Sequence, residues 1–168
     1  MEENIFKPDC IRTFTGKYVN AFNPDYTTID IIDVAHSLSM QCRFGGHLPN
    51  FYSVAQHSII CSELVPDEYK LTALLHDSTE FSLMDIPKPV KLRLKEYNDI
   101  EDNLMKHLAN IFGFIYPLPK IIKEVDTIML HREWNALMLR NAPFSHVLLN
   151  QREAKEEFLR VYNQLKKK

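Results

Sequence analysis

The sequence has few glycines, few cysteines and no long apolar run, and each shortage narrows what the chain can be. Only four glycines occur in 168 residues, while apolar residues recur at a spacing of about 3.6, so the chain is predicted to be nearly all helix. The three cysteines are widely spaced and form no CxxC pair, which argues against a disulfide framework or a cysteine zinc site. We therefore interpret Cys10, Cys42 and Cys61 as reduced, ordinary thiols.

Neither sign of charge is in excess. The net charge is −2, with 25% charged and 45% hydrophobic residues, a balance without bias toward nucleic acid polymers or anionic membranes. No apolar run is long enough to span a bilayer, and the acidic start MEENIFKPDC, broken by Pro8, resembles neither a secretion signal nor a transit peptide. We expect a cytoplasmic protein with no membrane partner and no nucleic acid partner.

The chain length and the helix signals predict one compact all-α helical bundle. An N-terminal arm, 1–27, with a small β-hairpin at 13–19, should precede the helical domain, 28–168. Ser53 and Asn150 have the spacing of helix N-caps, each followed by Gln or Glu three residues later. Helices are expected at about 28–43, from Ser53, from Asp67, at 89–112, at 119–140 and from Asn150 to the end.

Polar side chains interrupt three of these helices where apolar residues are expected. His57 lies in a nearly all-apolar helix, the pair His76 and Asp77 lies in the next one, and Asp126 lies within IIKEVDTIML. A buried carboxylate without a partner costs several kcal/mol or gives up its charge. Two imidazoles and two carboxylates in one core therefore predict a shared divalent cation, and this ligand set does not separate Co, Mn, Zn, Fe and Mg.

Each of these residues also has an ordinary interpretation. A single core histidine is more often hydrogen-bonded than metal-bound, and Asp126 could pair with Lys123 or Arg132. A purely structural helical protein remains an alternative on these grounds. The metal hypothesis depends on the three elements occurring together.

Further side chains near this set could serve an anionic substrate. Glu80 follows His76 by four residues, so both should face the same side of one helix, where Glu80 could orient or deprotonate an attacking water. Arg43 can offer a bidentate fork to phosphate, and the Gly45-Gly46 turn lets the backbone approach closely. Four further residues could belong to the same site: Asp85 in a proline-restricted loop, Lys88, Lys91 and His47. Each of them could equally be an ordinary surface residue.

These motifs together resemble a known family. The order of His57, His76-Asp77 and Asp126 resembles the HD-domain metal-dependent phosphohydrolases. The stretch HDSTEFSLMDIPKPVK is similar to the HD-domain 5'-deoxynucleotidases, and RFGGHLPNFYSVAQHS resembles their segment with the phosphate-binding Arg and the first metal His. The resemblance covers about residues 28–140.

The resemblance implies an enzyme with one catalytic divalent ion, held by the two histidines and two aspartates above. It implies further that Arg43 binds phosphate, Glu80 activates water and Asp85 contacts the sugar hydroxyl; Phe44 stands where those deoxynucleotidases have Trp. The expected reaction is release of phosphate from deoxynucleoside 5'-monophosphates. A deoxynucleoside triphosphate triphosphohydrolase and a non-catalytic nucleotide-binding sensor remain alternatives, and a homodimer remains open.

Overall fold

Helices make up most of the chain, as predicted, and a small antiparallel hairpin precedes them. The computed structural model describes residues 6–25 and 27–167. Strand β1 (Ile11–Arg12) pairs with β2 (Tyr18–Val19), so the predicted hairpin is present with its turn between them. The helices are α1 (Ile31–Met40), α2 (Val54–Glu63), α3 (Lys70–Leu75), α4 (Glu80–Leu83), α5 (Lys88–Lys91), α6 (Lys95–Phe112), α7 (Lys120–Glu133) and α8 (Gln151–Lys166).

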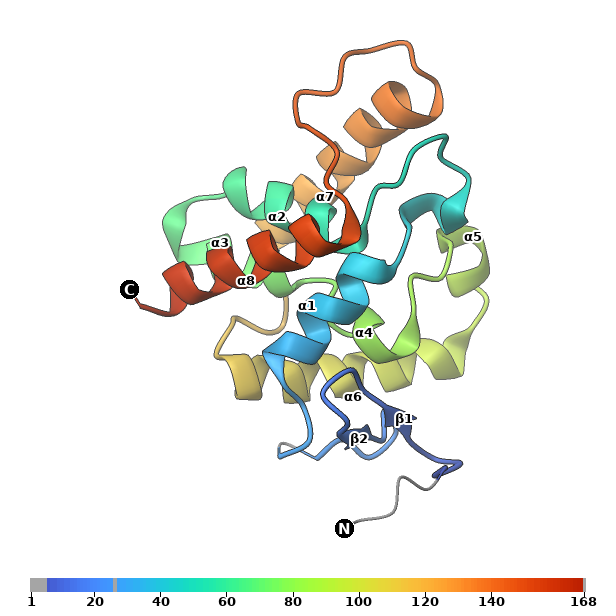
Figure 1. The fold of residues 1–168 in the computed structure, drawn as a ribbon, viewed down its shortest axis with the longest axis vertical. Helices are drawn as coiled ribbons and strands as arrows, with labels where there is room; N and C mark the ends of the chain where they lie inside the picture. Colours follow the sequence, from blue (N-terminus) through green and yellow to red (C-terminus); the bar gives the residue numbers. More distant parts are fainter. Residues whose placement is uncertain (1–5, 26, 168) are drawn as a thin grey trace.

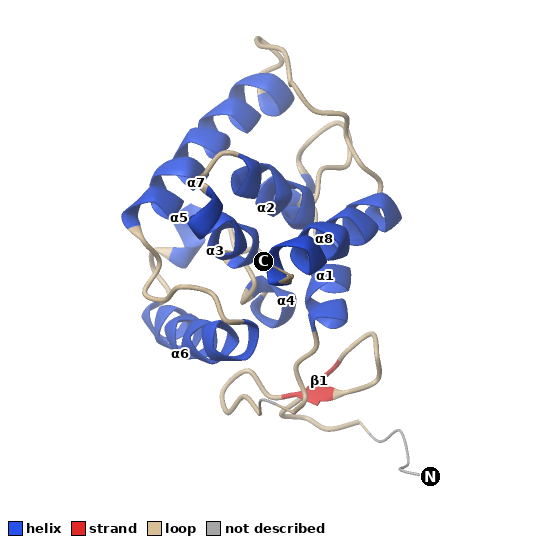
Figure 2. Cartoon of the chain, turned by 90° about the vertical axis from the view of Figure 1, so that its left-hand side faces the viewer, coloured by secondary structure: helices blue, strands red, loops and turns tan. Residues whose placement is uncertain are grey.

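Helices α2 and α3 lie at the centre of one domain and the others pack around them. Helix α8 contacts α1, α2 and α3, and α7 contacts α2 from another side (Figure 2). Helix α6 crosses the end of the molecule that carries the hairpin, far from the outer end of α7 (Figure 1). No helix among the described residues is long and apolar enough to cross a membrane.

Two apolar clusters meet at α2. The larger one joins α1, α3, α6 and α8 through side chains such as Leu74 and Phe158, and the smaller one joins α2 and α3 to α7 through Ile60 and Ile122. Because α2 contributes to both clusters, nearly all of its surface is buried, which explains its apolar sequence. A polar side chain on α2 is thereby held in the core.

The helix starts agree with the predicted caps. Asn150 and Glu153 form a complete capping box at the start of α8. The Ser53 side chain accepts the Gln56 backbone N–H at the start of α2, but the Gln56 side chain is used elsewhere. The Asn150 prediction is therefore confirmed in full and the Ser53 prediction in part.

Two predicted helices are broken. The third ends at Leu75, and a turn then leads to α4, with the Ser78 and Glu80 N–H groups bonding to carbonyls three residues back. His76 and Glu80 therefore do not lie one turn apart on a continuous helix, which corrects the expectation from their spacing. The helix predicted at 89–112 is likewise divided into α5 and α6.

Candidate metal centre

Four side chains from three helical segments converge on one point beside α2. His57 Nε2 lies 3.1 Å from Asp126 Oδ1 and 3.7 Å from Asp77 Oδ2. His76 Nε2 lies 3.3 Å from the same Asp77 oxygen and 3.9 Å from the same Asp126 oxygen. The structure thus brings together all four residues that the sequence singled out as ligands.

Both histidines are fixed so that Nε2 faces this point. His57 Nδ1 donates to Glu133 Oε1 at 2.6 Å, and His76 Nδ1 donates to the Ala73 carbonyl at 2.7 Å. Since each Nδ1 is already used as a donor, each neutral ring presents the lone pair of Nε2 to the carboxylates. Lone pairs and carboxylate oxygens repel one another unless a proton or a cation lies between them.

Protons alone satisfy this cluster incompletely. Burial lowers the pKa of His76, but Asp77 and Asp126 more than offset this and raise it to about 9. Burial raises the pKa of Asp126, yet the neighbouring His57 and His76 side chains hold it well below its usual value. Even so, the buried Nε2 of His76 has no hydrogen-bond partner within the described part of the chain. A cation at this point would bind the Nε2 of His76 and both carboxylates, so the residues fit a metal ion.

Glu133 supports this arrangement through hydrogen bonds, and the sequence analysis did not identify this residue. Its fully buried carboxylate accepts hydrogen bonds from His57, from Tyr52 Oη at 2.7 Å and from Arg43 Nε at 3.0 Å. Burial raises the pKa of Glu133, but His57 and Arg43 outweigh that effect and lower it. A carboxylate that orients a ligating imidazole is a common support of metal sites. The one sequence signal for Glu133 is its spacing. It follows Asp126 by seven residues, two turns along the same helix, and therefore lies on the same helix face.

Cys61 also lies at the centre, although the sequence analysis did not single it out. Its Sγ is 3.5 Å from His57 Nε2, one turn further along α2. One ligand atom each from His57, Cys61 and His76 lie within 4.8 Å of one another, and all three residues are buried. This group could hold a metal ion, and it adds a sulfur donor to the nitrogen and oxygen donors that the sequence predicted.

Helix α4 and the turn after it place Glu80 and Asp85 at the same cavity. Gln41 fixes both ends of this segment, because its Nε2 donates to the Glu80 carbonyl at 2.9 Å and its Oε1 accepts the Asp85 N–H at 3.0 Å. Between them Met84 has φ 67° and ψ 155°, a conformation found almost only in glycine. Burial and the Asp77 and Asp85 charges raise the pKa of Glu80 well above its usual value.

One cavity of about 1260 Å³ is lined by the predicted site residues other than His57 and His76. Its lining includes Arg43, Phe44, His47, Asp77, Glu80, Asp85, Lys88, Lys91 and Asp126. The Asp126 side chain is 43% exposed, so the metal point opens toward this cavity on the α7 side. The structure therefore gathers every predicted site residue at one place, except that His57 and His76 lie behind the cavity wall.

Two of the predicted phosphate contacts differ in detail from the sequence prediction. Arg43 presents Nε and Nη2 to Glu133, so one edge of its fork is used inside the protein, and Nη1 lies 3.8 Å from Asp77. The edge that contains Nη1 is the part left for a ligand. Lys91 forms an ion pair with Glu101, whereas Lys88 lies on the cavity lining in the turn of α5.

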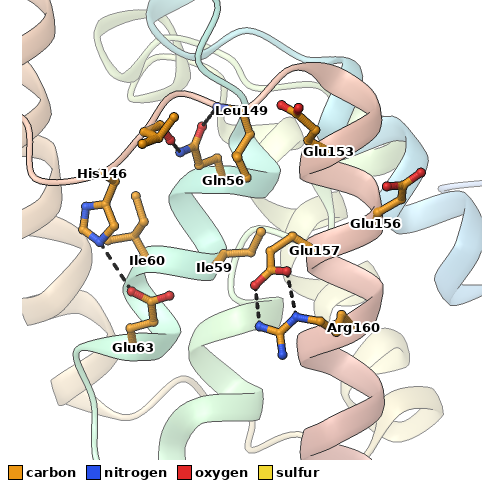
Figure 3. Close-up of a pocket in the computed structure, with 11 residues that line it drawn as sticks. Gln56, Ile59, Ile60, Glu63, His146, Leu149, Glu153, Glu156, Glu157 and Arg160 are labelled. Atoms are coloured by element: carbon orange, nitrogen blue, oxygen red, sulfur yellow. Dashed lines mark hydrogen bonds and ion pairs between the residues drawn. The ribbon is translucent and has the colours of Figure 1, made fainter.

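A second hollow, of about 560 Å³, lies between α2 and α8 (Figure 3). It is lined by several acidic side chains, but each already has a partner: Glu63 with His146, Glu153 with Asn150, Glu156 with Arg152 and Glu157 with Arg160. Gln56 closes its upper end by bonding Val147 and Leu149 of the connecting segment. The Gln56 contacts attach the segment before α8 to α2.

Comparison with known proteins places the chain in a family. No family model matches the chain. It is 42% identical over 140 residues to the uncharacterized protein YfdR of Escherichia coli K12, which covers 82% of this chain and 78% of YfdR. It is 32% identical over 136 residues to an uncharacterized protein of Rhodobacter capsulatus, covering 73% of this chain and 69% of that protein. At this identity over most of both sequences, the chain belongs to the same family as YfdR.

Proposed function

We propose that this protein is a metal-dependent phosphohydrolase of small nucleotides, of the HD-domain type, that releases phosphate from deoxynucleoside 5'-monophosphates. One observation carries the proposal: the Nε2 atoms of two histidines, each fixed through Nδ1, converge with the Asp77 and Asp126 carboxylates at the wall of a large cavity. The motif resemblance stated from the sequence supports the same reaction.

The ligand set and the neighbouring side chains divide the chemistry between them. A divalent ion held by His57, His76, Asp77 and Asp126 would supply positive charge to the phosphoryl group and acidify a water nucleophile. Arg43 adds a second positive charge through the edge that contains Nη1, on the same side of the cavity as Asp77. Together they would neutralise the phosphoryl oxygens as the phosphorus is attacked.

Glu80 is the side chain best placed to accept the proton of the attacking water. It lines the cavity together with Asp77, and its buried Oε2 has no hydrogen-bond partner in residues 6–25 and 27–167. General base catalysis of this kind contributes about 10²- to 10⁴-fold. The Gln41 contact holds the Glu80 backbone, so the carboxylate has a fixed base from which to reach the water.

The charges of the cavity favour a monophosphate over a triphosphate. Four carboxylates line it, and Lys91 is already paired with Glu101. Two cations of the lining remain for a ligand. Lys88 forms no ion pair within residues 6–25 and 27–167, and Arg43 keeps the edge that contains Nη1. Asp77 and Asp126 would hold the metal ion and offset its charge, so Arg43 and Lys88 are left to compensate the phosphate, which suits the lower charge of a monophosphate.

A substrate panel tests the proposal. The protein would be incubated with Mn or Co and with ribo- and deoxynucleoside mono-, di- and triphosphates, and the released phosphate species would be identified. We expect inorganic phosphate from deoxynucleoside monophosphates, and a loss of about 10²- to 10⁴-fold in kcat for Glu80→Gln with metal binding retained. Release of triphosphate would favour the triphosphohydrolase, and metal binding without any hydrolysis would favour the sensor.

A further inference from the structure

The cavity that contains the metal point continues onto an apolar and aromatic wall far larger than a phosphate group needs. Beyond Asp77 and Asp126 its lining includes Phe44, Ile86, Leu92, Leu130, Trp134 and Met138. Trp134 is the single tryptophan of the chain, and it is 45% exposed although it lines a pocket. A large exposed aromatic surface inside a cavity with a charged end is typical of a ligand seat.

The charged end and the aromatic end are joined by one helix. Asp126, Leu130 and Trp134 are spaced by four residues along α7 and its continuation, so they lie along one face. Eight residues of helix correspond to about 12 Å along the axis. A single ligand that reaches from the carboxylates to Trp134 must therefore carry an extended body attached to its anionic group.

Both aromatic side chains of the lining lie in unusual backbone turns. Trp134 begins the π-helical turn η3 (Trp134–Met138), and such turns often occur at functional sites. Phe44 lies in the turn η1 (Arg43–Gly46) with φ 57° and ψ 32°, a left-handed conformation that side chains other than glycine rarely adopt. The Arg43 guanidinium carbon lies 5.6 Å from the centre of the Phe44 ring, which places that ring beside the phosphate-binding edge.

The ring geometry indicates how a ligand would contact the wall. The centres of the Phe44 and Trp134 rings are 6.1 Å apart, with the ring planes tilted by 46°. A slot that holds a flat ring between two others needs about 7 Å between parallel faces, twice the usual contact distance. The two side chains therefore form one continuous surface, against which a flat ring can pack from the cavity side.

We infer that Trp134, with Phe44, is the seat of the substrate's planar heteroaromatic base, the nucleobase of the nucleotide. The inference rests on the proposed function for its phosphate end. Leu130 and Met138 complete the apolar floor beside the indole, while the charged end receives the phosphate. Trp134 is thus a specificity-determining residue: it selects nucleotides over sugar phosphates that lack a base.

Kinetics with paired substrates test this assignment. The wild type, Trp134→Ala and Trp134→Phe would be compared on deoxyadenosine 5'-monophosphate and on 2-deoxyribose 5-phosphate in the presence of Mn. Packing of one base on an aromatic ring changes affinity by about 5- to 150-fold. Trp134→Ala should lose this factor in kcat/KM on the nucleotide alone, and Trp134→Phe should retain most of it. Phe22→Ala, an exposed aromatic outside the cavity lining, is the matched control and should change neither substrate.

Fluorescence keeps the test independent of catalysis. Because the chain has one tryptophan, its emission reports this position alone. Deoxyadenosine 5'-monophosphate should change the emission of the Mn-loaded wild type, and 2-deoxyribose 5-phosphate should not. Base-dependent emission without hydrolysis of either compound would refute the proposed function and leave the base seat standing. Equal losses on both substrates in Trp134→Ala, or an emission unaffected by the nucleotide, would overturn the inference.

Discussion

Substitution of Glu133 perturbs the candidate centre most selectively, because its buried carboxylate contacts the predicted ligand His57 through a hydrogen bond. In Glu133→Gln the amide oxygen can still accept from His57 and Tyr52, but the amide nitrogen then faces Arg43 Nε and Nη2, which are donors at 3.0 Å. Arg43 loses its closer carboxylate partner and keeps only Asp77, at 3.8 Å. Breaking a buried ion pair by removing one partner costs about 3–5 kcal/mol.

The same substitution should weaken metal binding. A neutral amide is a poorer acceptor for the His57 Nδ1–H than a carboxylate, so the imidazole becomes a weaker ligand and its orientation is less fixed. Loss of such a supporting contact typically costs about 10- to 100-fold in metal affinity. We therefore expect a free energy of unfolding lower by about 3 kcal/mol without metal and a Kd for Mn or Co higher by at least about tenfold.

Urea denaturation with a chelator and calorimetric titration with the metal measure these two effects separately. Asp33→Asn is the matched control, since Asp33 is buried and accepts two hydrogen bonds from Thr15 outside the centre. It should lower stability and leave metal affinity unchanged. An affinity in Glu133→Gln equal to that of the wild type would refute the role assigned to Glu133.

Three further predictions concern Met84, Cys61 and Asn150. Met84→Gly should raise the free energy of unfolding by about 1 kcal/mol in urea denaturation, because relief of a conformation that costs about 1–3 kcal/mol outweighs the entropy that glycine loses on folding; a lower stability would contradict the strain. In the Co-loaded protein, Cys61→Ser should abolish a sulfur-to-cobalt charge-transfer band that Cys10→Ser retains, and a wild type that binds Co without this band would show that Cys61 is no ligand. Asn150→Ala should cost about 1 kcal/mol through loss of the α8 cap, and an unchanged urea midpoint would count against that cap.

The fold and the convergence of the four polar side chains could be predicted because their signals are local. Apolar periodicity placed the helices, and the N-cap pattern located the start of α8 at Asn150. His57 and Asp126 stood out because each interrupts an apolar surface, and the structure brings both to the same point. A polar residue in an apolar helix needs a partner in the core, and that requirement is readable from sequence.

The supporting residues could not be predicted because their signals depend on packing between distant segments. Glu133 ends a helix rich in charge, so the sequence alone indicates a surface residue. Only the structure shows that Arg43 and Tyr52 bond to its carboxylate. Gln41 acts through backbone groups 39 and 44 positions away, which no spacing reveals. The break after Leu75 was missed because helical periodicity continues through it, while the hydrogen bonds change to the tighter three-residue pattern.

The central claim is that two imidazoles and two carboxylates close on one cation beside α2. Anomalous diffraction from crystals grown with Mn tests it most directly. We predict one strong peak within bonding distance of His57 Nε2, His76 Nε2 and the Asp77 and Asp126 carboxylates, at a point open to the cavity. Crystals that contain Mn in solution but show no anomalous peak among these atoms would contradict the claim.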